Sequence, residues 1–212
     1  MAYHITTPQP VLNTQSLTLQ PMFKIAITPE IPDERKEPGM IRCLLEGGWD
    51  RVHLRHPGAS RREMRNLIEA IPQELHSRLV LHGHFDLVND FNLGGLHLNR
   101  RCPTPPANYR GALSRSCHTI GEVKENSGSD YVTLSPIFDS ISKSGYQSAF
   151  TPTELSQLDA VTTPVIALGG VTSERIDELK RYNFSGFAML GSIPWDGDNS
   201  DMLNFINQMN KF

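Results

Sequence analysis

Eight short, β-rich apolar runs recur from residue 23 onward, and amphipathic stretches separate most of them. The runs cover residues 24–28, 51–54, 79–81, 95–98, 112–116, 131–135, 165–168 and 186–190. Helices are expected over residues 40–46, 61–71, 120–126, 153–158, 174–182 and 202–210. Because strands that alternate with helices form a parallel sheet, this order predicts an α/β protein, and eight repeats favour a closed (β/α)8 TIM barrel. An open flavodoxin-like sheet, which needs fewer strands, is the structural alternative.

The length of the chain fits one compact domain. The 190 residues from Phe23 to Phe212 give about 24 residues per unit, which is tight for a fold that typically takes roughly 250 residues. The fourth helix is expected to be shortened, because Pro103, Pro105 and Pro106 cannot lie in an ordinary helix. Residues 1–21 are polar and proline-containing, so we expect an N-terminal arm before a barrel domain of residues 22–212.

The composition of the chain excludes several kinds of partner. The formal net charge is −3, and no block of like charges occurs, so neither nucleic acid nor an anionic membrane surface is expected to bind. No apolar run approaches the roughly 20 residues that span a bilayer. The three cysteines are an odd number, which argues against a disulfide framework, so we expect a reducing compartment and a cytoplasmic location.

Polar residues gather at the ends of the expected strands, where barrels of this type carry their reactive groups. These positions hold His53, Arg55, His82, His84, His97, Ser116 and His118, and the loop after the sixth strand holds Lys143. Arg55 suits a bidentate bond to a carboxylate or phosphate, and the loop around Lys143 has the length of a lid. The ordinary pKa of histidine, about 6.5, suits proton transfer, so His118 is a candidate acid/base. A surface arginine, a mobile loop without function and a structural histidine are the alternatives.

Two glycine-containing loops predict a phosphate site. Gly169 and Gly170 follow the seventh run and lead into a helix start, and the eighth run is followed by Gly191, Ser192 and Ile193. Glycines allow backbone N–H groups to approach an anion closely, and the loops after strands seven and eight hold phosphate in many barrels. Tight turns without a ligand are the alternative, and the match of both loops favours phosphate.

A cluster of imidazoles is a further interpretation of the same strand ends. His82 and His84, with His53, His97 and His118 nearby, are residues of the type that ligates metals. Side-chain alternation along the strands does not put all of them on one wall, and Asp86 is the one carboxylate beside them. No metal is therefore expected.

Taken in order, the motifs resemble the thiamine phosphate synthase superfamily, which includes the TenI-type thiazole tautomerases. The resemblance runs from about residue 23 to residue 193 and rests on VHLR, GLHL, SRSCHT, DYVTLSPIFDSISK, PVIALGG and GFAMLGSI. It implies a (β/α)8 fold whose mouth binds a thiazole phosphate. By position, the resemblance assigns the phosphate to Gly169, Gly170, Ser192 and Ile193.

The chain departs from the synthase branch where that branch binds magnesium. In the synthases the third strand ends in Asn-Asp-Arg, a second aspartate follows the fourth strand, and both acids bind the magnesium of the pyrimidine diphosphate. This chain has His82-Gly83-His84 at the first place and Cys102 near the second, and Pro57 stands where the synthases have a lysine. The TenI-type branch also lacks the magnesium acid and carries a histidine at the position of His118.

The resemblance therefore implies a metal-free thiazole tautomerase of thiamine biosynthesis, an isomerase that aromatises a thiazole carboxylate phosphate by proton transfer. His118 would be the acid/base and Arg55 would hold the carboxylate, with His53, His82, Ser116 and Lys143 among the substrate-binding residues. One alternative is a thiamine phosphate synthase, a pyrophosphorylase that uses magnesium and contacts diphosphate through Lys143 and Ser116. Another is a non-catalytic regulator that binds thiazole or thiamine phosphates. A homodimer is also considered.

Overall fold

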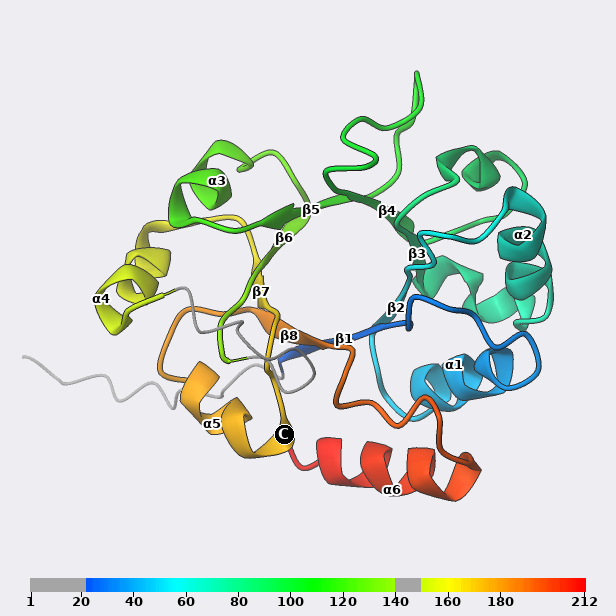
Figure 1. Ribbon diagram of the computed structural model, residues 1–212. Helices are drawn as coiled ribbons and strands as arrows, with labels where there is room; N and C mark the ends of the chain where they lie inside the picture. The colour runs from blue at the N-terminus through cyan, green and yellow to red at the C-terminus, as the bar shows by residue number, and fades with distance from the viewer. Residues whose placement is uncertain (1–21, 140–149) are drawn as a thin grey trace, which may run out of the picture.

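The computed structural model describes residues 22–139 and 150–212. Eight parallel strands close into a barrel in chain order, with β8 paired to β1. The strands are β1 (Phe23–Ile27), β2 (Arg51–Leu54), β3 (Leu79–Leu81), β4 (Gly95–Leu98), β5 (Leu113–Cys117), β6 (Tyr131–Leu134), β7 (Val165–Ala167) and β8 (Gly186–Met189). Figure 1 shows the helices as an outer ring around these strands. The predicted TIM barrel is confirmed, and the open flavodoxin-like sheet is wrong.

Helices and short 3-10 helices follow every strand except β4, on the outside of the barrel. The α-helices are α1 (Glu37–Glu46), α2 (Arg61–Glu69), α3 (Ile120–Glu125), α4 (Pro152–Leu155), α5 (Ile176–Leu179) and α6 (Asn199–Met209). The 3-10 helices are η1 (Gln73–Arg78), η2 (Phe85–Asn89), η3 (Ser156–Ala160) and η4 (Ser173–Arg175). Capping boxes start α2, at Ser60 and Glu63, and α6, at Asp198 and Asp201. These side chains accept from backbone N–H groups that the first helical turn leaves free.

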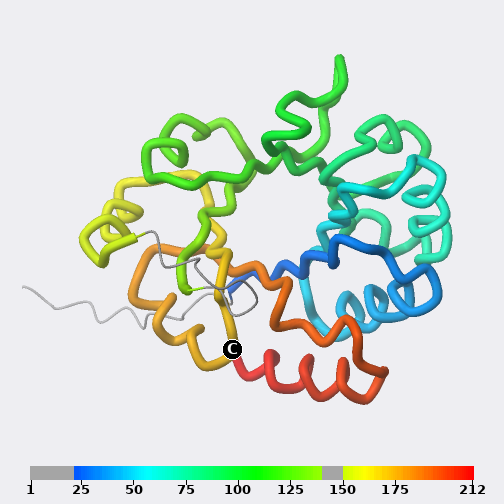
Figure 2. The backbone as a smooth tube through the Cα atoms, in the orientation of Figure 1, coloured from blue at the N-terminus to red at the C-terminus, as the bar shows by residue number. Residues whose placement is uncertain are grey.

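The connection between β4 and β5 contains no helix, although every residue of it is described. Residues 99–112 form an irregular loop that projects from the ring of helices (Figure 2). The expected fourth helix is therefore absent rather than shortened. Pro103, Pro105 and Pro106 explain this, because each lacks an N–H donor and its ring clashes with the preceding helical turn.

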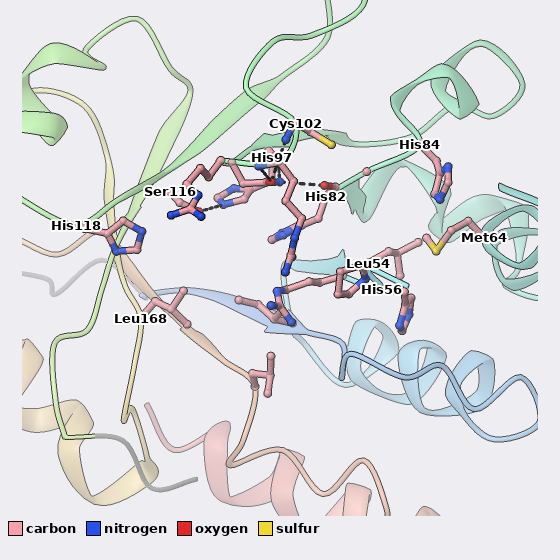
Figure 3. Close-up of a pocket in the computed structure, with 18 residues that line it drawn as sticks. Leu54, His56, Met64, His82, His84, His97, Cys102, Ser116, His118 and Leu168 are labelled. Carbon is pink, nitrogen blue, oxygen red and sulfur yellow. Dashed lines mark hydrogen bonds between the residues drawn. The ribbon is translucent and has the colours of Figure 1, made fainter. Parts of the chain in front are cut away.

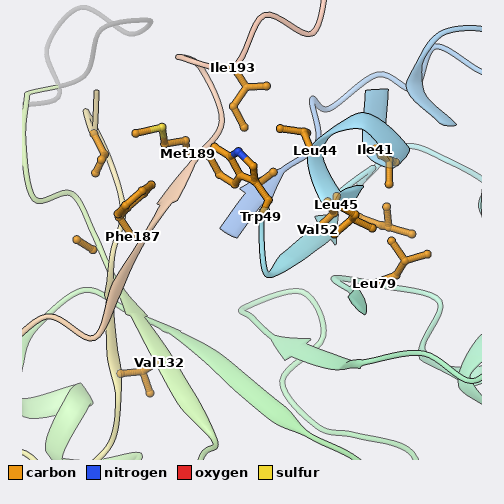
Figure 4. Packing of buried hydrophobic residues seen from close by; sticks show 14 of the residues in the cluster. Ile41, Leu44, Leu45, Trp49, Val52, Leu79, Val132, Phe187, Met189 and Ile193 are labelled. Atoms are coloured by element: carbon orange, nitrogen blue, oxygen red, sulfur yellow. The ribbon is translucent and has the colours of Figure 1, made fainter. Parts of the chain in front are cut away.

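The main hydrophobic core lies between the outer faces of the strands and the helices. Trp49 is fully buried there, with its ring centroid 6.2 Å from Phe187 in an edge contact and 5.7 Å from Phe205 in a stacked one. Figure 4 shows Trp49 between Leu44 of α1 and Met189 of β8. Aromatic pairs of this kind add about 1 kcal/mol each to the energy of burial. This layer holds α1 and α6 on the barrel.

The inside of the barrel is divided into two halves. The apolar half consists of Ile25 and Ile27 on β1, Ile166 on β7 and Ala188 on β8. The polar half comes from β2, β4, β5 and β6 and from His82, which directly follows β3. Its members are His53, His82, His97, Ser114, Ser116, Tyr131 and Thr133. The barrel interior thus joins an ordinary packed core to a group of hydrogen-bonding side chains beneath the mouth.

Among the described residues, none of the helices combines the length and the apolar character that crossing a bilayer demands. The N-terminal arm expected over residues 1–21 lies outside the described residues.

Candidate active site at the mouth of the barrel

A cavity of about 630 Å³ lies at the carboxyl ends of the strands. Its volume is in the range of small-molecule sites. The arginine and histidine side chains that line it are Arg55, Arg100, Arg101, His56, His82, His84, His97 and His118. Ile27, Leu54, Leu168 and Leu190 supply its apolar surface. Figure 3 draws the lining side chains, which come from several strand ends and, as at Cys102, from the loop after β4.

Arg55 lies where the sequence predicted it, directly after β2. Its backbone N–H donates to Thr28 Oγ1 at 2.8 Å, which joins the ends of β1 and β2. Its Nη2 lies 3.0 Å from Glu30 Oε1. Because both side chains are partly exposed, this ion pair contributes little to stability and leaves the guanidinium able to exchange Glu30 for a bound anion.

Arg100 and Arg101 are cavity residues that the sequence analysis missed. They follow Asn99, whose Nδ2 donates to the carbonyls of His82 at 2.9 Å and His97 at 3.1 Å. Asn99 thereby fixes the start of the irregular loop over the ends of β3 and β4. The signal that could have found the pair was two consecutive arginines directly after a strand end.

His118 is exposed and lines the cavity beside β5. Its Nδ1 donates to the backbone carbonyl of Ser135 at 3.0 Å, which leaves Nε2 as the acceptor nitrogen. The neighbouring Cys117 is fully buried, and burial raises the pKa of its thiol to about 11. Cys117 is therefore a small core residue and not an activated nucleophile.

The polar half of the interior brings three histidine rings together. His53 Nδ1 lies 2.8 Å from His82 Nε2, and the rings of His82 and His97 stack with centroids 4.3 Å apart. His53 Nε2 lies 2.6 Å from the Tyr131 hydroxyl. The two nitrogens of His97 lie 2.8 Å from Ser114 Oγ and 2.8 Å from Ser116 Oγ. Of the three rings, those of His82 and His97 line the cavity and that of His53 lies below them.

Three of the five strand-end histidines meet here, whereas His84 and His118 lie outside the cluster with other partners. His53 pairs in register with Val80 of β3, and Leu81 pairs with Leu96 of β4. His82, two residues after Val80, therefore shares the inward parity of His53, and the same register brings it beside His97. Alternation within one strand determines which side chains point into the barrel. Only the register between strands shows that the three rings lie at the same height along the barrel axis.

Burial keeps the three imidazoles neutral. Desolvation lowers the pKa of His53 and of His82 well below the ordinary value, and His97 adds to both effects. Desolvation, aided by Arg115, lowers the pKa of His97 to about 3. Burial also raises the pKa of the Tyr131 hydroxyl to about 12, so this group stays a hydrogen-bond donor. All four groups are uncharged near pH 7.

The glycines after β7 occur in conformations that other residues rarely adopt. Gly169 has φ +93° and Gly170 has φ +64°. A Cβ on Gly170 would lie 2.4 Å from the Asp139 carbonyl oxygen, so a larger residue is excluded by both space and conformation. The N–H groups of Gly169, Gly170, Gly191 and Ser192 have no acceptor among the described residues.

The remaining predicted residues have different environments. Ser192 Oγ donates to the Val171 carbonyl at 2.9 Å, linking the loops after β7 and β8. Ile193 is buried in the hydrophobic core, so it can offer a ligand only its backbone. Lys143 lies outside the described residues.

The donor set at the cavity does not fit magnesium. Among the described residues that line it there is no aspartate or glutamate, and Mg²⁺ is held in proteins mainly by carboxylate oxygens and water. The nearby carboxylate of Glu37 is buried and bonded to His56 Nε2 at 2.8 Å. The described residues therefore do not reproduce the magnesium site that the resemblance implies.

Sequence and structure comparisons identify the family. A sequence profile described as thiamine monophosphate synthase matches residues 25–193. The chain belongs to this family. The thiamine-phosphate synthase of Salinibacter ruber is 25% identical over 175 residues, which cover 77% of each chain. A crystal structure of a thiamine phosphate pyrophosphorylase from Bacteroides thetaiotaomicron is 32% identical with a TM-score of 0.79, covering 90% of this chain and 96% of that one.

A protein of Clostridium tetani is also named thiamine-phosphate synthase. It is 26% identical over 166 residues, which cover 73% of this chain and 78% of its own length. These names overturn the expected tautomerase, and the acid/base role given to His118 falls with it. The cavity supplies a physical reason. Its three arginines offer more cationic groups than one carboxylate and one monophosphate need. The missing carboxylates distinguish the donor set of this cavity from that of the synthases, and they did not identify the reaction.

Proposed function

We propose that the protein is a transferase that joins a pyrimidine diphosphate to a thiazole phosphate, releasing pyrophosphate and forming thiamine phosphate. One observation carries the proposal. In the described part of the chain, the cavity at the barrel mouth is lined by arginines and by no carboxylate, and it lies beside four backbone N–H groups that have no acceptor there. Two phosphorylated substrates need two anion sites at one mouth. Membership of the family supports the same pair of substrates.

The arginines are assigned to the diphosphate. Arg55 approaches from the end of β2, and Arg100 and Arg101 approach from the loop after β4. Guanidinium groups bind phosphate oxygens in a bidentate manner, and bonds between charged groups are about twice as strong as neutral ones. Three such groups offset the negative charge that the synthases of the resemblance neutralise with magnesium.

The N–H groups after β7 and β8 are assigned to the thiazole phosphate. Gly169, Gly170, Gly191 and Ser192 offer backbone donors that carry no side chain or a small one. Leu168 and Leu190 precede these loops and line the cavity, so they would contact the ring while the loops bind the phosphate. This assignment agrees with the phosphate role expected from the sequence.

The reaction needs positioning and charge stabilisation more than proton transfer. The carbon–oxygen bond to the diphosphate breaks, and its electron pair leaves on the diphosphate oxygen. The lone pair of the thiazole nitrogen forms the new carbon–nitrogen bond, so no proton is taken up or released by the protein. Arginines that already face the leaving group stabilise the charge that develops on it.

The direct test is formation of thiamine phosphate and pyrophosphate from the two substrates, assayed with Mg²⁺ and with a chelator. We expect product, and we expect Arg100→Gln or Arg101→Gln to lower kcat/KM by about 10- to 100-fold, the equivalent of one charged hydrogen bond of about 1.5–3 kcal/mol. Arg110→Gln is the matched control, because Arg110 is exposed in the same loop and does not line the cavity.

Absence of product under both conditions would contradict the proposal. Tight binding of both substrates without product would instead indicate a binding protein. Equal losses of kcat/KM in the Arg110 and Arg101 variants would show that these changes act by disturbing the loop structure. The charges that face the cavity would then have no role in binding the diphosphate.

A further inference from the structure

We propose that His53, His82 and His97 form a binding site for one divalent transition-metal ion, Zn²⁺ before others, whose fourth coordination position opens into the cavity. The inference does not rest on the proposed transferase activity. The three histidines have no role in the binding of the diphosphate or of the thiazole phosphate as assigned above.

The distances between the ring nitrogens suit three ligands of one ion. One nitrogen from each ring lies within 4.8 Å of the other two, and His53 Nδ1 and His82 Nε2 are 2.8 Å apart. A tetrahedral Zn²⁺ with Zn–N bonds of about 2.0 Å separates its ligand atoms by about 3.3 Å. Small ring rotations, which widen one gap and narrow the others, are therefore enough to enclose the ion.

The hydrogen bonds behind the rings give His53 and His97 the tautomers that metal ligands need. His53 donates from Nε2 to the Tyr131 oxygen at 2.6 Å, which leaves Nδ1 with a lone pair toward His82. Tyr131 in turn is bonded to Ser114, and the Ser114 hydroxyl donates to the Leu96 carbonyl at 3.4 Å.

His97 has a serine at each ring nitrogen, Ser114 and Ser116, both at 2.8 Å. Whichever nitrogen binds the ion, the other can donate to a hydroxyl. Partners of this kind, which fix the ring and its tautomer, accompany metal-binding histidines in proteins.

The cluster is open on one side only. His53 is fully buried and His97 is 1% exposed, whereas His82 is half-buried and lines the cavity together with His97 and Ser116. An ion would enter from the cavity and would keep its fourth position there. Three protein ligands with an open fourth position are typical of catalytic zinc, and closed four-ligand sites are typical of structural zinc.

The chemistry of the donors selects the ion. Neutral imidazoles suit zinc and other late first-row metals, whereas magnesium and calcium prefer oxygen ligands. The arginines that act on the rings are Arg51 on His53, Arg55 on His82 and Arg115 on His97. A bound Zn²⁺ would therefore add to positive charge, and an anion is the expected fourth ligand.

The test uses the full chain without a histidine tag, stripped with a chelator and then titrated with Zn²⁺ or Co²⁺. We expect one ion per chain, no competition from Mg²⁺, and the intense visible bands of tetrahedral Co²⁺. Azide, a small anion, should shift these bands by occupying the fourth position. Thiolate charge-transfer bands should be absent, because the assigned ligands are all nitrogens.

Variants locate the site. His82→Gln should abolish stoichiometric binding, and its half-buried position makes it the mildest change to the cluster. His84→Gln is the matched control: His84 lines the same cavity, and its Nε2 donates to the Ala59 carbonyl at 2.7 Å, outside the cluster. Circular dichroism and thermal unfolding check that each variant is folded.

Three results would overturn the inference. The first is wild-type protein that binds no stoichiometric Zn²⁺. The second is binding that survives His82→Gln or is lost in His84→Gln. The third is a Co²⁺ spectrum with thiolate bands, which would assign the ion to cysteine. The wild-type titration decides the question even if a variant fails to fold.

Discussion

The two halves of the barrel interior belong to one continuous sheet, yet they are filled by different kinds of side chain. The apolar half, around Ile25 and Ile166, needs only matching volumes. The polar half, around His53 and His97, needs a hydrogen-bond partner for nearly every buried atom. The apolar half should therefore respond to a change in size, and the polar half to a change in protonation or in a single hydroxyl. Three predictions test this difference.

The largest effect is expected from a cavity in the apolar half. Ile166 is 1% exposed, so Ile166→Ala should lower the free energy of unfolding by about 3 kcal/mol, through lost burial and the space left behind. Ile166→Val, the matched control, should lose about 1 kcal/mol. Urea titration measures both. A loss below 1 kcal/mol for the alanine variant would mean that this half collapses around the gap.

Acid should weaken the metal-free protein through the polar half. The pKa of His97 is about 3 in the folded protein and about 6.5 in an unfolded chain. Between these pH values the unfolded chain binds more protons than the folded protein. The contribution of neutral His97 to the free energy of unfolding is therefore fully present above about pH 6.5 and decreases as the pH falls. At pH 5 the loss from His97 alone is about 2 kcal/mol. The lowered pKa values of His53 and His82 act in the same direction.

Urea titrations at pH 7, 6 and 5, above the range in which most carboxylates titrate, measure this loss. His97→Gln is expected to be less stable at pH 7 but to show a shallower dependence on pH. Equal unfolding free energies at pH 7 and pH 5 in the wild-type protein would mean that the rings are not held neutral.

A smaller effect is expected from one hydroxyl of the polar half. Tyr131→Phe keeps the ring but leaves His53 Nε2–H without its acceptor at 2.6 Å, which should cost about 1.5 kcal/mol. Tyr109→Phe is the control, because that half-buried hydroxyl makes only a 3.4 Å bond to the Ala112 carbonyl, and it should change stability by less than about 0.5 kcal/mol. Thermal unfolding compares the pair. Equal decreases of Tm in the two variants would show that the hydrogen bond between Tyr131 and His53 stabilises the protein no more than the weak bond of Tyr109 does.

The sequence contained enough information for the barrel, because each strand is a short apolar run that local composition reveals. It also predicted that the segment with Pro103 is not an ordinary helix, and missed only that the helix is absent altogether. The sequence indicated histidines at neighbouring strand ends but not which of them meet, since the meeting of His53, His82 and His97 depends on the register of three strands. Residue spacing along one strand does not carry that information.

The candidate site shows the same limit. Arg55 was predicted because it directly follows a strand, whereas Arg100 and Arg101 reach the cavity from an irregular loop whose course no periodicity predicts. The reaction was misjudged for a different reason. The absence of two acids favours a different enzyme only if nothing else offsets the charge of the diphosphate, and arginines elsewhere at the mouth can do so.

The connection between β4 and β5 contains no helix, so residues that face the cavity are carried on a segment that contributes little to the packing of the barrel. Two arginines of the cavity are carried on residues 99–112, which no helix anchors against the barrel wall. Insertions, deletions or exchanged side chains there can alter which anions are accepted while the remaining strands and helices keep their packing. We expect this stretch to be the place where laboratory evolution most readily produces new ligand selectivity in this protein.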